Sequence, residues 1–308
     1  MKIVHINNTA GVASIVANQQ KKHGDNADVF VFNKIIYKQF GGNKFNYYSP
    51  LSRWKFFRKL KNYDIWHYHH PYGSLKISLE KQNKNKIYLK HYHGDELRGR
   101  YDNDFCLVST PDLLQYAPLG RWLPNPIDID AIELISKKNY NEQQKQEPQL
   151  HNSNDNRIIN IAHYPYYKNY RSDDHYSDVL IKLQNERKCK IVTILNLSHE
   201  QTLKTMASCD LVIGKILPDI GWFGKFELEG MAMGKPVIAY ISDDLYEKYK
   251  PPIYRTTKDT FKHDLECLLE DDAERDRLSR EGQTYVRGVH SIQSTINTIY
   301  ECYNKLMR

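Results

Sequence analysis

A glycine-rich turn that leads into a helix is the strongest chemical feature of this sequence. The turn runs from Gly221 to Gly224, and the predicted helix after it carries Glu229. The first backbone N–H groups of a helix lack partners within the helix, and with the helix dipole they attract phosphate. A carboxylate at Glu229 could accept hydrogen bonds from two ribose hydroxyls. An ordinary helix with a glycine start and surface glutamates fits the same residues, so both interpretations stay open here.

A pair of cations in an aromatic loop is the second feature. Lys168 and Arg171 follow the apolar run 157–162. Two cations after a strand suit a leaving diphosphate, whose negative charge grows in the transition state. Taken alone, the pair also fits a loop with two solvated cations. Beside the Glu229 helix, we interpret it as a diphosphate clamp.

Histidines gather in two short segments. His67 and His69 fall on one face of the region of a predicted strand, because side chains alternate along a strand. His91 ends the next predicted strand, and His93 follows it. No cysteine lies nearby and the neighbouring acids complete no known ligand pattern, so we expect no metal site. His93 has two interpretations, a residue at a sugar and a histidine satisfied within the fold.

Residues 51–61 form an unusually basic stretch. Five cations and three aromatic side chains interleave there: Arg53, Trp54, Lys55, Phe56, Phe57, Arg58, Lys59 and Lys61. The preferred interpretation is a helix with an apolar stripe and a solvated basic face. The stripe would consist of Leu51, Trp54, Phe57 and Leu60. The alternative is an interfacial patch for anionic lipid or for a charged acceptor.

Charge is distributed unevenly along the chain. The net formal charge is +7, yet residues 1–125 hold 19 Lys and Arg against 9 Asp and Glu, so the remainder is slightly acidic. The basic first half should meet an anionic partner or a membrane surface that the second half does not. No recognition motif for nucleic acid accompanies this charge, so we do not expect a nucleic-acid-binding protein, although an anionic polymer is a candidate acceptor.

Length and composition indicate a globular cytoplasmic chain. At about 100–200 residues per domain, 308 residues suggest two domains. No apolar run approaches the roughly 18 residues of a membrane span, and the segment Met1–Asn7 is typical of a first strand rather than a signal peptide. The five cysteines are scattered without zinc-like spacing, so we expect reduced thiols.

Strand-like and helix-like runs alternate along most of the chain, which predicts βαβ units, parallel sheets and the α/β class. Predicted strands are 2–7, 28–33, 64–68, 86–91, 105–109, 157–162, 190–195, 210–213 and 236–241. Predicted helices are 13–22, 51–61, 75–84, 173–186, 200–208, 225–233, 258–269, 273–286 and 291–307. The expected organisation is a first domain over 1–128, a linker or loop over 129–156, a second domain over 157–288, and a last helix over 289–308 that returns to the first domain.

Residues Glu229–Val237 resemble the donor-site signature of family-4-type retaining glycosyltransferases of the GT-B fold. That family has two glutamates eight positions apart, and the second begins the run Glu-Ala-Met-Ala-x-Gly-Lys-Pro-Val. Here Glu229 stands for the second glutamate, whereas a glycine takes the place of the first. The turn is similar to a Gly-Trp-Tyr-Gly version of the family's turn and reads Gly221, Trp222, Phe223, Gly224.

Four shorter matches follow the same order along the chain. Gly11 lies after the first strand, as the family's glycine loop does, and His93–Arg98 resembles its His-Gly-x-x-Leu-Arg segment, whose histidine faces the transferred sugar. Pro124–Asp128 is similar to a Pro-Asn-Gly-Val-Asp segment near the domain crossover. His163–Arg171 is similar to the stretch that holds the family's diphosphate clamp.

The resemblance implies two Rossmann-like domains facing across a cleft, the first on the acceptor side and the second binding a UDP- or GDP-sugar. It implies transfer with retention, with the diphosphate as base, and no metal, because cations and backbone N–H groups take its place. Implied donor-binding residues are Gly11, Lys168, Arg171, Gly221, Trp222, Phe223, Gly224 and Glu229. Implied catalytic residues are His93, Lys168 and Arg171. Implied residues on the sugar or acceptor side are His69, His93 and Arg98.

Two other functions stay open for this fold, a sugar-nucleotide epimerase and a catalytically weak sugar-nucleotide-binding protein. An epimerase needs several acid and base carboxylates at the sugar, whereas a binding protein would hold the nucleotide without turnover. The Asp-x-Asp triplets 102–104 and 128–130 lie outside the expected donor domain, so we interpret them as structural and not as metal ligands.

Overall fold

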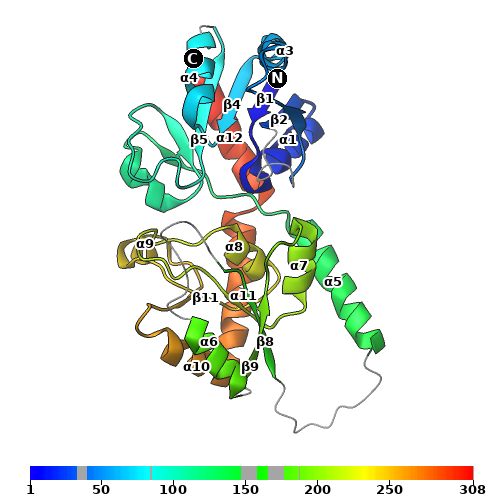
Figure 1. Ribbon diagram of the computed structural model, residues 1–308, viewed down its shortest axis with the longest axis vertical. Coiled ribbons are helices and arrows are strands. Elements are labelled where there is room, and N and C mark those ends of the chain that lie inside the picture. The colour runs from blue at the N-terminus through cyan, green and yellow to red at the C-terminus, as the bar shows by residue number, and fades with distance from the viewer. Residues whose placement is uncertain (33–39, 84, 147–157, 166–176, 187, 308) are drawn as a thin grey trace. The chain divides into compact units, whose positions relative to one another are not determined.

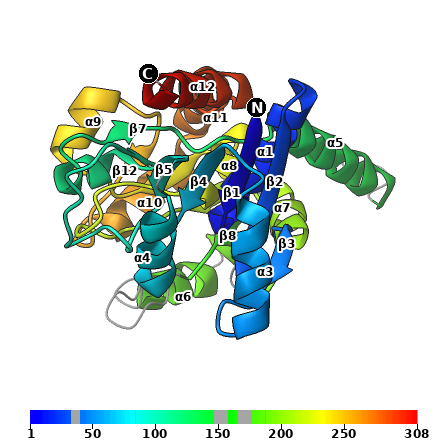
Figure 2. The same ribbon diagram turned by 90° about the horizontal axis from the view of Figure 1, so that it is seen from above.

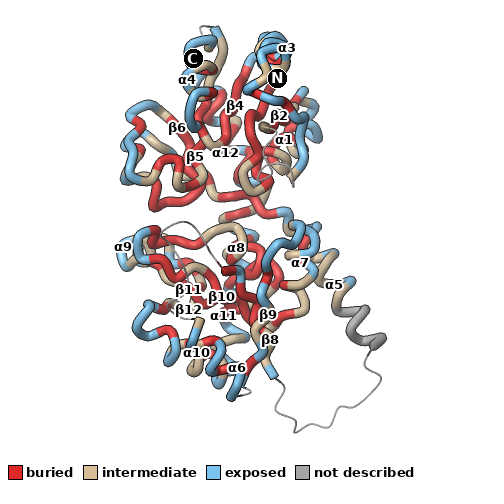
Figure 3. The backbone as a smooth tube through the Cα atoms, viewed as in Figure 1, coloured by how far each residue is buried: buried red, intermediate tan, exposed pale blue. Residues whose placement is uncertain are grey.

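The computed structural model describes residues 1–32, 40–83, 85–146, 158–165, 177–186 and 188–307, with backbone only over 140–146. The chain divides into two compact units, drawn in Figure 1. Unit 1 comprises Met1–Pro126 and His290–Arg308, and unit 2 comprises Ile127–Val289. The strands of both units are largely buried, as Figure 3 shows, because each sheet carries helices on both faces.

In its described residues, unit 1 has a parallel sheet of seven strands in the order β3-β2-β1-β4-β5-β6-β7. The strands are β1 (Lys2–Ile6), β2 (Asn26–Phe32), β3 (Asn43–Phe45), β4 (Ile65–His69), β5 (Ile87–Tyr92), β6 (Cys106–Val108) and β7 (Arg121–Trp122). Strand β1 lies between β2 and β4 (Figure 2). The winding of the chain reverses between β1 and β4, and ligands of such sheets bind beside the carboxyl ends of the strands at this switch point.

Alternating side chains of the unit 1 strands pack against helices on the two faces of the sheet. The helices are α1 (Val12–Lys22), α3 (Pro50–Leu60), α4 (Gly73–Gln82) and α12 (Ile292–Met307). Ile3, Ile65 and Leu89 face α1 and α12, whereas Val4 and Trp66 face α3 and α4. The C-terminal helix α12 therefore completes the core of unit 1.

Unit 2 contains a parallel five-stranded sheet in its described residues, with the order β12-β11-β10-β8-β9. The strands are β8 (Ile159–His163), β9 (Cys189–Thr193), β10 (Leu211–Ile213), β11 (Val237–Ala239) and β12 (Tyr254–Arg255). The helices are α5 (Ile129–Gln146), α6 (Ser177–Asn185), α7 (His199–Ala207), α8 (Lys225–Ala232), α9 (Asp243–Tyr249), α10 (Phe261–Glu270) and α11 (Asp272–Val289). The switch point of this sheet lies between β8 and β10.

The linker predicted from residue 129 is wrong over its first part, because α5 occupies Ile129–Gln146. Ile129, Ile132 and Ile135 are spaced as on one helix face and pack against the core of unit 2. Asp128 accepts a hydrogen bond from the Ala131 N–H and caps the helix. The polar Gln and Glu residues that suggested a linker are good helix formers, so they extend the helix.

The predicted apolar stripe of the basic helix is correct in Phe57 and Leu60, which pack against the core, and wrong in Leu51 and Trp54. In α3, Leu51 and Trp54 are 61% and 56% exposed, whereas Phe56 and Leu60 are buried. Phe56 stacks on Phe45 at 3.9 Å between ring centroids. Phe45 belongs to β3, a short edge strand that the sequence analysis missed, and its position decides which side of α3 faces the core.

Three further features bear on the expectations from sequence. All five cysteines are free thiols. Asp102 and Asp104 bind the buried Lys90 ammonium at 2.7 and 2.8 Å, so this Asp-x-Asp triplet has a structural role. In the part of the chain that the structure describes, no helix is long and apolar enough to cross a membrane.

Candidate functional site

The switch point of the unit 2 sheet carries a small pocket. Its volume is about 170 Å³, and it is lined by Tyr164 after β8, by Ile213, Gly214 and Lys215 at β10, and by Lys225, Phe226 and Glu227 of α8. Lys215 and Lys225 make this pocket a place for an anion. Lys215 was not among the site residues predicted from the sequence. It lies directly after a short apolar strand and a glycine, a position that is typical of a ligand-binding loop.

Glu227 fixes the backbone around this pocket. Its buried carboxylate accepts the Lys215 N–H at 2.8 Å and the Gly224 N–H at 2.9 Å, which ties the β10 loop to the first turn of α8. Gly214 is required here, because a Cβ atom would lie 2.6 Å from the Glu227 Cγ atom. The N–H of Gly224 is therefore bonded to a protein carboxylate, contrary to the bare N–H that the sequence suggested.

The Gly221–Gly224 turn presents backbone rather than side chains. Gly221 has φ +67°, and a Cβ atom there would lie 3.0 Å from the Ser242 Oγ atom, so a glutamate at this position would be strained. Trp222 and Phe223 are each 2% exposed and stack on one another at 4.4 Å. Their rings belong to the core of unit 2.

Glu229 lies one turn farther along α8 and is almost fully buried. Its Oε1 atom is 2.7 Å from the His199 Nε2 atom and 3.4 Å from the Lys225 Nζ atom. Burial alone would raise the pKa of Glu229, but Lys225 and His199 outweigh it and hold the pKa below its ordinary value. The carboxylate is therefore ionised, and both of these contacts engage its Oε1 atom.

The expected clamp residues Lys168 and Arg171 lie outside the described residues. The last residues described before them are His163, at the end of β8, Tyr164 and Pro165. Tyr164 lines the pocket together with Lys215 and Lys225.

The loop after β1 is the matching position in unit 1. Gly11 has φ +77° and precedes α1, and Asn7 and Ala10 also have positive φ values. The Asn8 carboxamide bonds the Ser14 backbone and side chain, so the N-terminus of α1 is capped from within the loop. The backbone conformation explains the glycine at position 11.

A histidine cluster lies near the carboxyl ends of β1, β4 and β5. It consists of His5, His67, His69, His91 and His93. The ring of His93 is bonded through both nitrogens, to His69 at 3.0 Å and to the Ser109 Oγ atom at 2.7 Å. Burial lowers the pKa of His93 to about 4, so the ring is neutral at pH 7.

The side chains beside His93 are also engaged within unit 1. Arg98 bonds Asp112 at 2.7 Å and Asp95 at 3.0 Å. Glu96 accepts the His93 N–H and lies 3.2 Å from the His70 Nδ1 atom. Burial alone would raise the pKa of Glu96, but His70 and the hydrogen bonds lower it to about 2.

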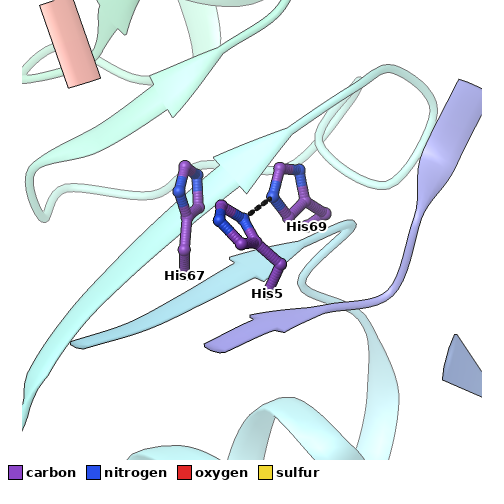
Figure 4. A group of neighbouring side chains, drawn as sticks. All are labelled: His5, His67 and His69. Atoms are coloured by element: carbon purple, nitrogen blue, oxygen red, sulfur yellow. Dashed lines mark hydrogen bonds between the residues drawn. The ribbon is translucent and has the colours of Figure 1, made fainter. Parts of the chain in front are cut away.

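Two groups within the histidine cluster bring three imidazoles close enough to be considered as metal ligands. They are His5, His67 and His69, drawn in Figure 4, and His69, His91 and His93, with candidate ligand atoms within 4.8 Å of one another in each group. The sequence analysis did not include His5. No such group is found in the described residues of unit 2.

Comparisons with known proteins establish the fold but do not identify the reaction. Neither the family models nor the curated proteins contain a match to this sequence. A glycosyltransferase from Rickettsia africae superposes with a TM-score of 0.67 at 13% identity, covering 100% of this chain and 98% of that chain. HepE from Anabaena, in complex with UDP-glucose, superposes with a TM-score of 0.67 at 15% identity, and the match covers 99% of this chain and 100% of that chain.

A UDP-GlcNAc 2-epimerase from Neisseria meningitidis, bound to UDP-GlcNAc, gives a TM-score of 0.60 at 11% identity, covering 99% of this chain and 100% of that chain. The α/β class and the GT-B-like fold with two parallel sheets are thereby confirmed. Proteins of this fold include glycosyltransferases and an epimerase, so the fold alone does not choose between these activities.

Proposed function

We propose that this chain transfers a sugar from a nucleoside diphosphate sugar to an acceptor, and that unit 2 binds the donor. The observation that carries the proposal is the buried, ionised Glu229 on α8, beside a pocket with Lys215 and Lys225 at the switch point of a doubly wound sheet. A carboxylate for ribose hydroxyls and cations for phosphate are what a nucleoside diphosphate requires. Similar folds bind UDP-glucose, which supports the proposal.

Transfer with retention and without metal is the mechanism we propose, following the family resemblance. The diphosphate would leave and act as base, while Lys215, Lys168 and Arg171 stabilise its growing charge. The acids near His93 are all engaged by cations or histidine, and this favours transfer over epimerisation. A binding protein without turnover is the third candidate, because a glycine stands where the family has its first glutamate.

The experiment is a panel of UDP-, GDP- and ADP-sugars incubated with the full chain in excess EDTA. We expect release of the nucleoside diphosphate to persist in EDTA, because lysines and backbone N–H groups would neutralise the leaving group. Activity that returns only with Mn²⁺ or Mg²⁺ would contradict the metal-free mechanism. An intact sugar nucleotide epimerised in its sugar would favour the epimerase, and binding without turnover would favour the binding protein.

Replacement of Glu229 should weaken nucleotide binding. We expect Glu229→Ala to cost about 1–3 kcal/mol of binding free energy for the best nucleotide, since charge-assisted hydrogen bonds to the ribose are lost. Isothermal titration with the nucleoside diphosphate measures it. Glu200→Ala is the matched control, because Glu200 is an exposed carboxylate next to His199. Equal affinities of the two folded variants would exclude Glu229 from the donor site.

Helix α3 is proposed as a contact with anionic membranes. Its exposed Leu51 and Trp54 lie among Arg53, Lys55 and Arg58, a combination that favours the interface of an anionic bilayer. We expect the chain to float with anionic vesicles at low salt and to be released as salt rises.

The vesicle experiment uses a variant with four cations changed to serine, Arg53, Lys55, Arg58 and Lys59. The control carries four serine changes at exposed lysines of unit 2, Lys182, Lys204, Lys248 and Lys262. Loss of flotation in the first variant alone is the expected result. No flotation of the unmodified chain, or equal flotation of both variants, would exclude α3 as the membrane contact.

A further inference from the structure

Four of the five histidines in the cluster are connected by one chain of hydrogen bonds. His5 Nδ1 lies 2.9 Å from His69 Nε2 (Figure 4), and His69 Nδ1 lies 3.0 Å from His93 Nε2. The hydroxyl of Ser109 then joins His93 Nδ1 at 2.7 Å to His91 Nε2 at 2.9 Å. Each neutral imidazole has one N–H donor and one bare acceptor nitrogen, so the tautomer of one ring determines the tautomer of the next ring in the chain.

Gln20 of α1 sets the direction of this chain. Its Oε1 atom lies 2.7 Å from His5 Nε2, and an amide oxygen only accepts, so His5 carries its proton on Nε2. His5 Nδ1 is then an acceptor, and His69 must donate to it from Nε2. His69 Nδ1 is therefore an acceptor, so His93 donates to it from Nε2. His93 Nδ1 then accepts the Ser109 O–H. The Ser109 oxygen accepts in turn from His91, which carries its proton on Nε2.

A second branch leads from Gln20 through Tyr303 of α12 to His67. The Gln20 amide nitrogen lies 3.5 Å from the Tyr303 oxygen, which lies 2.8 Å from His67 Nδ1. Burial raises the pKa of Tyr303 far above its ordinary value, so the phenol keeps its proton. Its O–H then donates to His67 Nδ1, and His67 must be protonated on Nε2.

The two branches end in complementary atoms. His67 Nε2 and His91 Nδ1 are both buried, and neither has a hydrogen-bond partner among the described residues. With the Gln20 oxygen facing His5, His67 Nε2 is a donor and His91 Nδ1 is an acceptor. Their rings are neighbours, with centroids 5.4 Å apart. A group that accepts one hydrogen bond and donates another would satisfy both.

This conclusion does not depend on how the Gln20 amide is oriented. If its oxygen and nitrogen are exchanged, every proton in the two branches moves to the other ring nitrogen. His67 Nε2 then becomes the acceptor and His91 Nδ1 the donor, so the ends stay complementary. In either orientation all five histidines are the same tautomer, all protonated on Nε2 or all on Nδ1.

We infer that unit 1 binds one buried water molecule between His67 and His91, and that this water closes the hydrogen bonds of the histidine cluster into a ring. A water molecule both donates and accepts, and buried waters typically satisfy polar groups of this kind. A metal ion fits less well. It would need bare nitrogens where the chain of hydrogen bonds places protons.

The ring of hydrogen bonds leaves His93 no ring nitrogen for proton transfer to or from a substrate. Both of its ring nitrogens are occupied, by His69 and by Ser109. A substrate at this edge of the sheet would therefore meet the backbone or a carbon edge of His93, whose orientation the cluster holds.

Long-range ¹H–¹⁵N spectra of the full chain with ¹⁵N-labelled histidine test the inference. We expect the five cluster histidines to share one tautomer near pH 7, whereas the exposed His23 should show exchange between tautomers. If the amide is oriented as described, the His67 ring N–H should show a cross-peak to a long-lived water. If it is reversed, the His91 ring N–H should show that cross-peak.

Variants at Ser109 give the matched test. Ser109→Ala removes the link between His91 and His93, so we expect loss of the shared tautomer, whereas Ser109→Thr keeps the hydroxyl and should keep it. Mixed tautomers in the unmodified protein would overturn the inference. So would an equimolar transition metal, measured by elemental analysis, or the absence of any cross-peak to water at both rings.

Discussion

Unit 1 is expected to lose several kcal/mol of its stability between pH 7 and pH 5. Burial lowers the pKa of His5 from its ordinary value of 6.5 to about 4, and it lowers the pKa of His67, His69 and His91 well below that ordinary value. These four rings are neutral and at most 1% exposed in the folded state. The unfolded chain, by contrast, binds protons as the pH falls below about 6.5.

The sign follows from the protons bound in each state. Because the unfolded state binds more protons below pH 6.5, stability decreases as the pH falls, until the folded rings themselves take up protons, which for His5 happens at about pH 4. At pH 5, His5 alone accounts for about 2 kcal/mol, from a difference of about 1.5 pH units at about 1.4 kcal/mol per unit. His67, His69 and His91 each lower the free energy of unfolding further as the pH falls. The total free energy of unfolding of a typical domain is only about 5–15 kcal/mol.

Hydrogen exchange with mass spectrometry between pH 7 and pH 5 distinguishes the two units of the chain. We expect peptides from β1, β4 and β5 to lose protection before those from β8 and β10, after correction for the intrinsic exchange rate. His67→Gln should reduce the proton uptake on unfolding by up to one. Unit 1 stability that is flat over this range would contradict the neutral cluster.

The elements of this fold could largely be predicted from the sequence because their signals are local. Apolar runs such as 2–7 and 210–213 indicated buried parallel strands, and the observed β1 and β10 lie within them. The short edge strand β3 and helix α9 were missed, because three and seven residues carry too little periodicity. The first part of the predicted linker was wrong because the helical spacing of Ile129, Ile132 and Ile135 was overlooked beside a polar run that suits a helix as well as a loop.

The side chains around each site could not be predicted, because they meet through the order of strands. His5 lies far from the other histidines in sequence, and only the pairing of β1 with β4 brings it to His69. Tyr303 reaches His67 from a helix at the other end of the chain. The resemblance to a family led to Glu229, yet no sequence pattern indicated that His199, at the start of α7, would be its partner.

The cations around the unit 2 pocket should matter more for turnover than for donor binding. A diphosphate gains negative charge as the glycosidic bond breaks, so a nearby cation stabilises the transition state more than the ground state. Lys215 lines the pocket, and so does Tyr164, which precedes Lys168 and Arg171 in the sequence. We expect Lys168→Ala, Arg171→Ala and Lys215→Ala each to lower turnover by about 10²–10³-fold, the loss typical of one such group.

Steady-state kinetics with the donor found in the nucleotide panel measures this effect. The change in kcat should exceed the change in KM, since the lost interaction forms mainly in the transition state. Lys204→Ala is the matched control, because Lys204 is an exposed lysine of α7 that pairs with Glu200 on the same helix. A large loss for Lys215→Ala alone would place the clamp on the β10 loop and show that the proposed alignment of residues 163–171 is wrong. Near-normal turnover in all three folded variants would mean that the diphosphate is not held at this pocket, and Glu229 would then have to be tested without it.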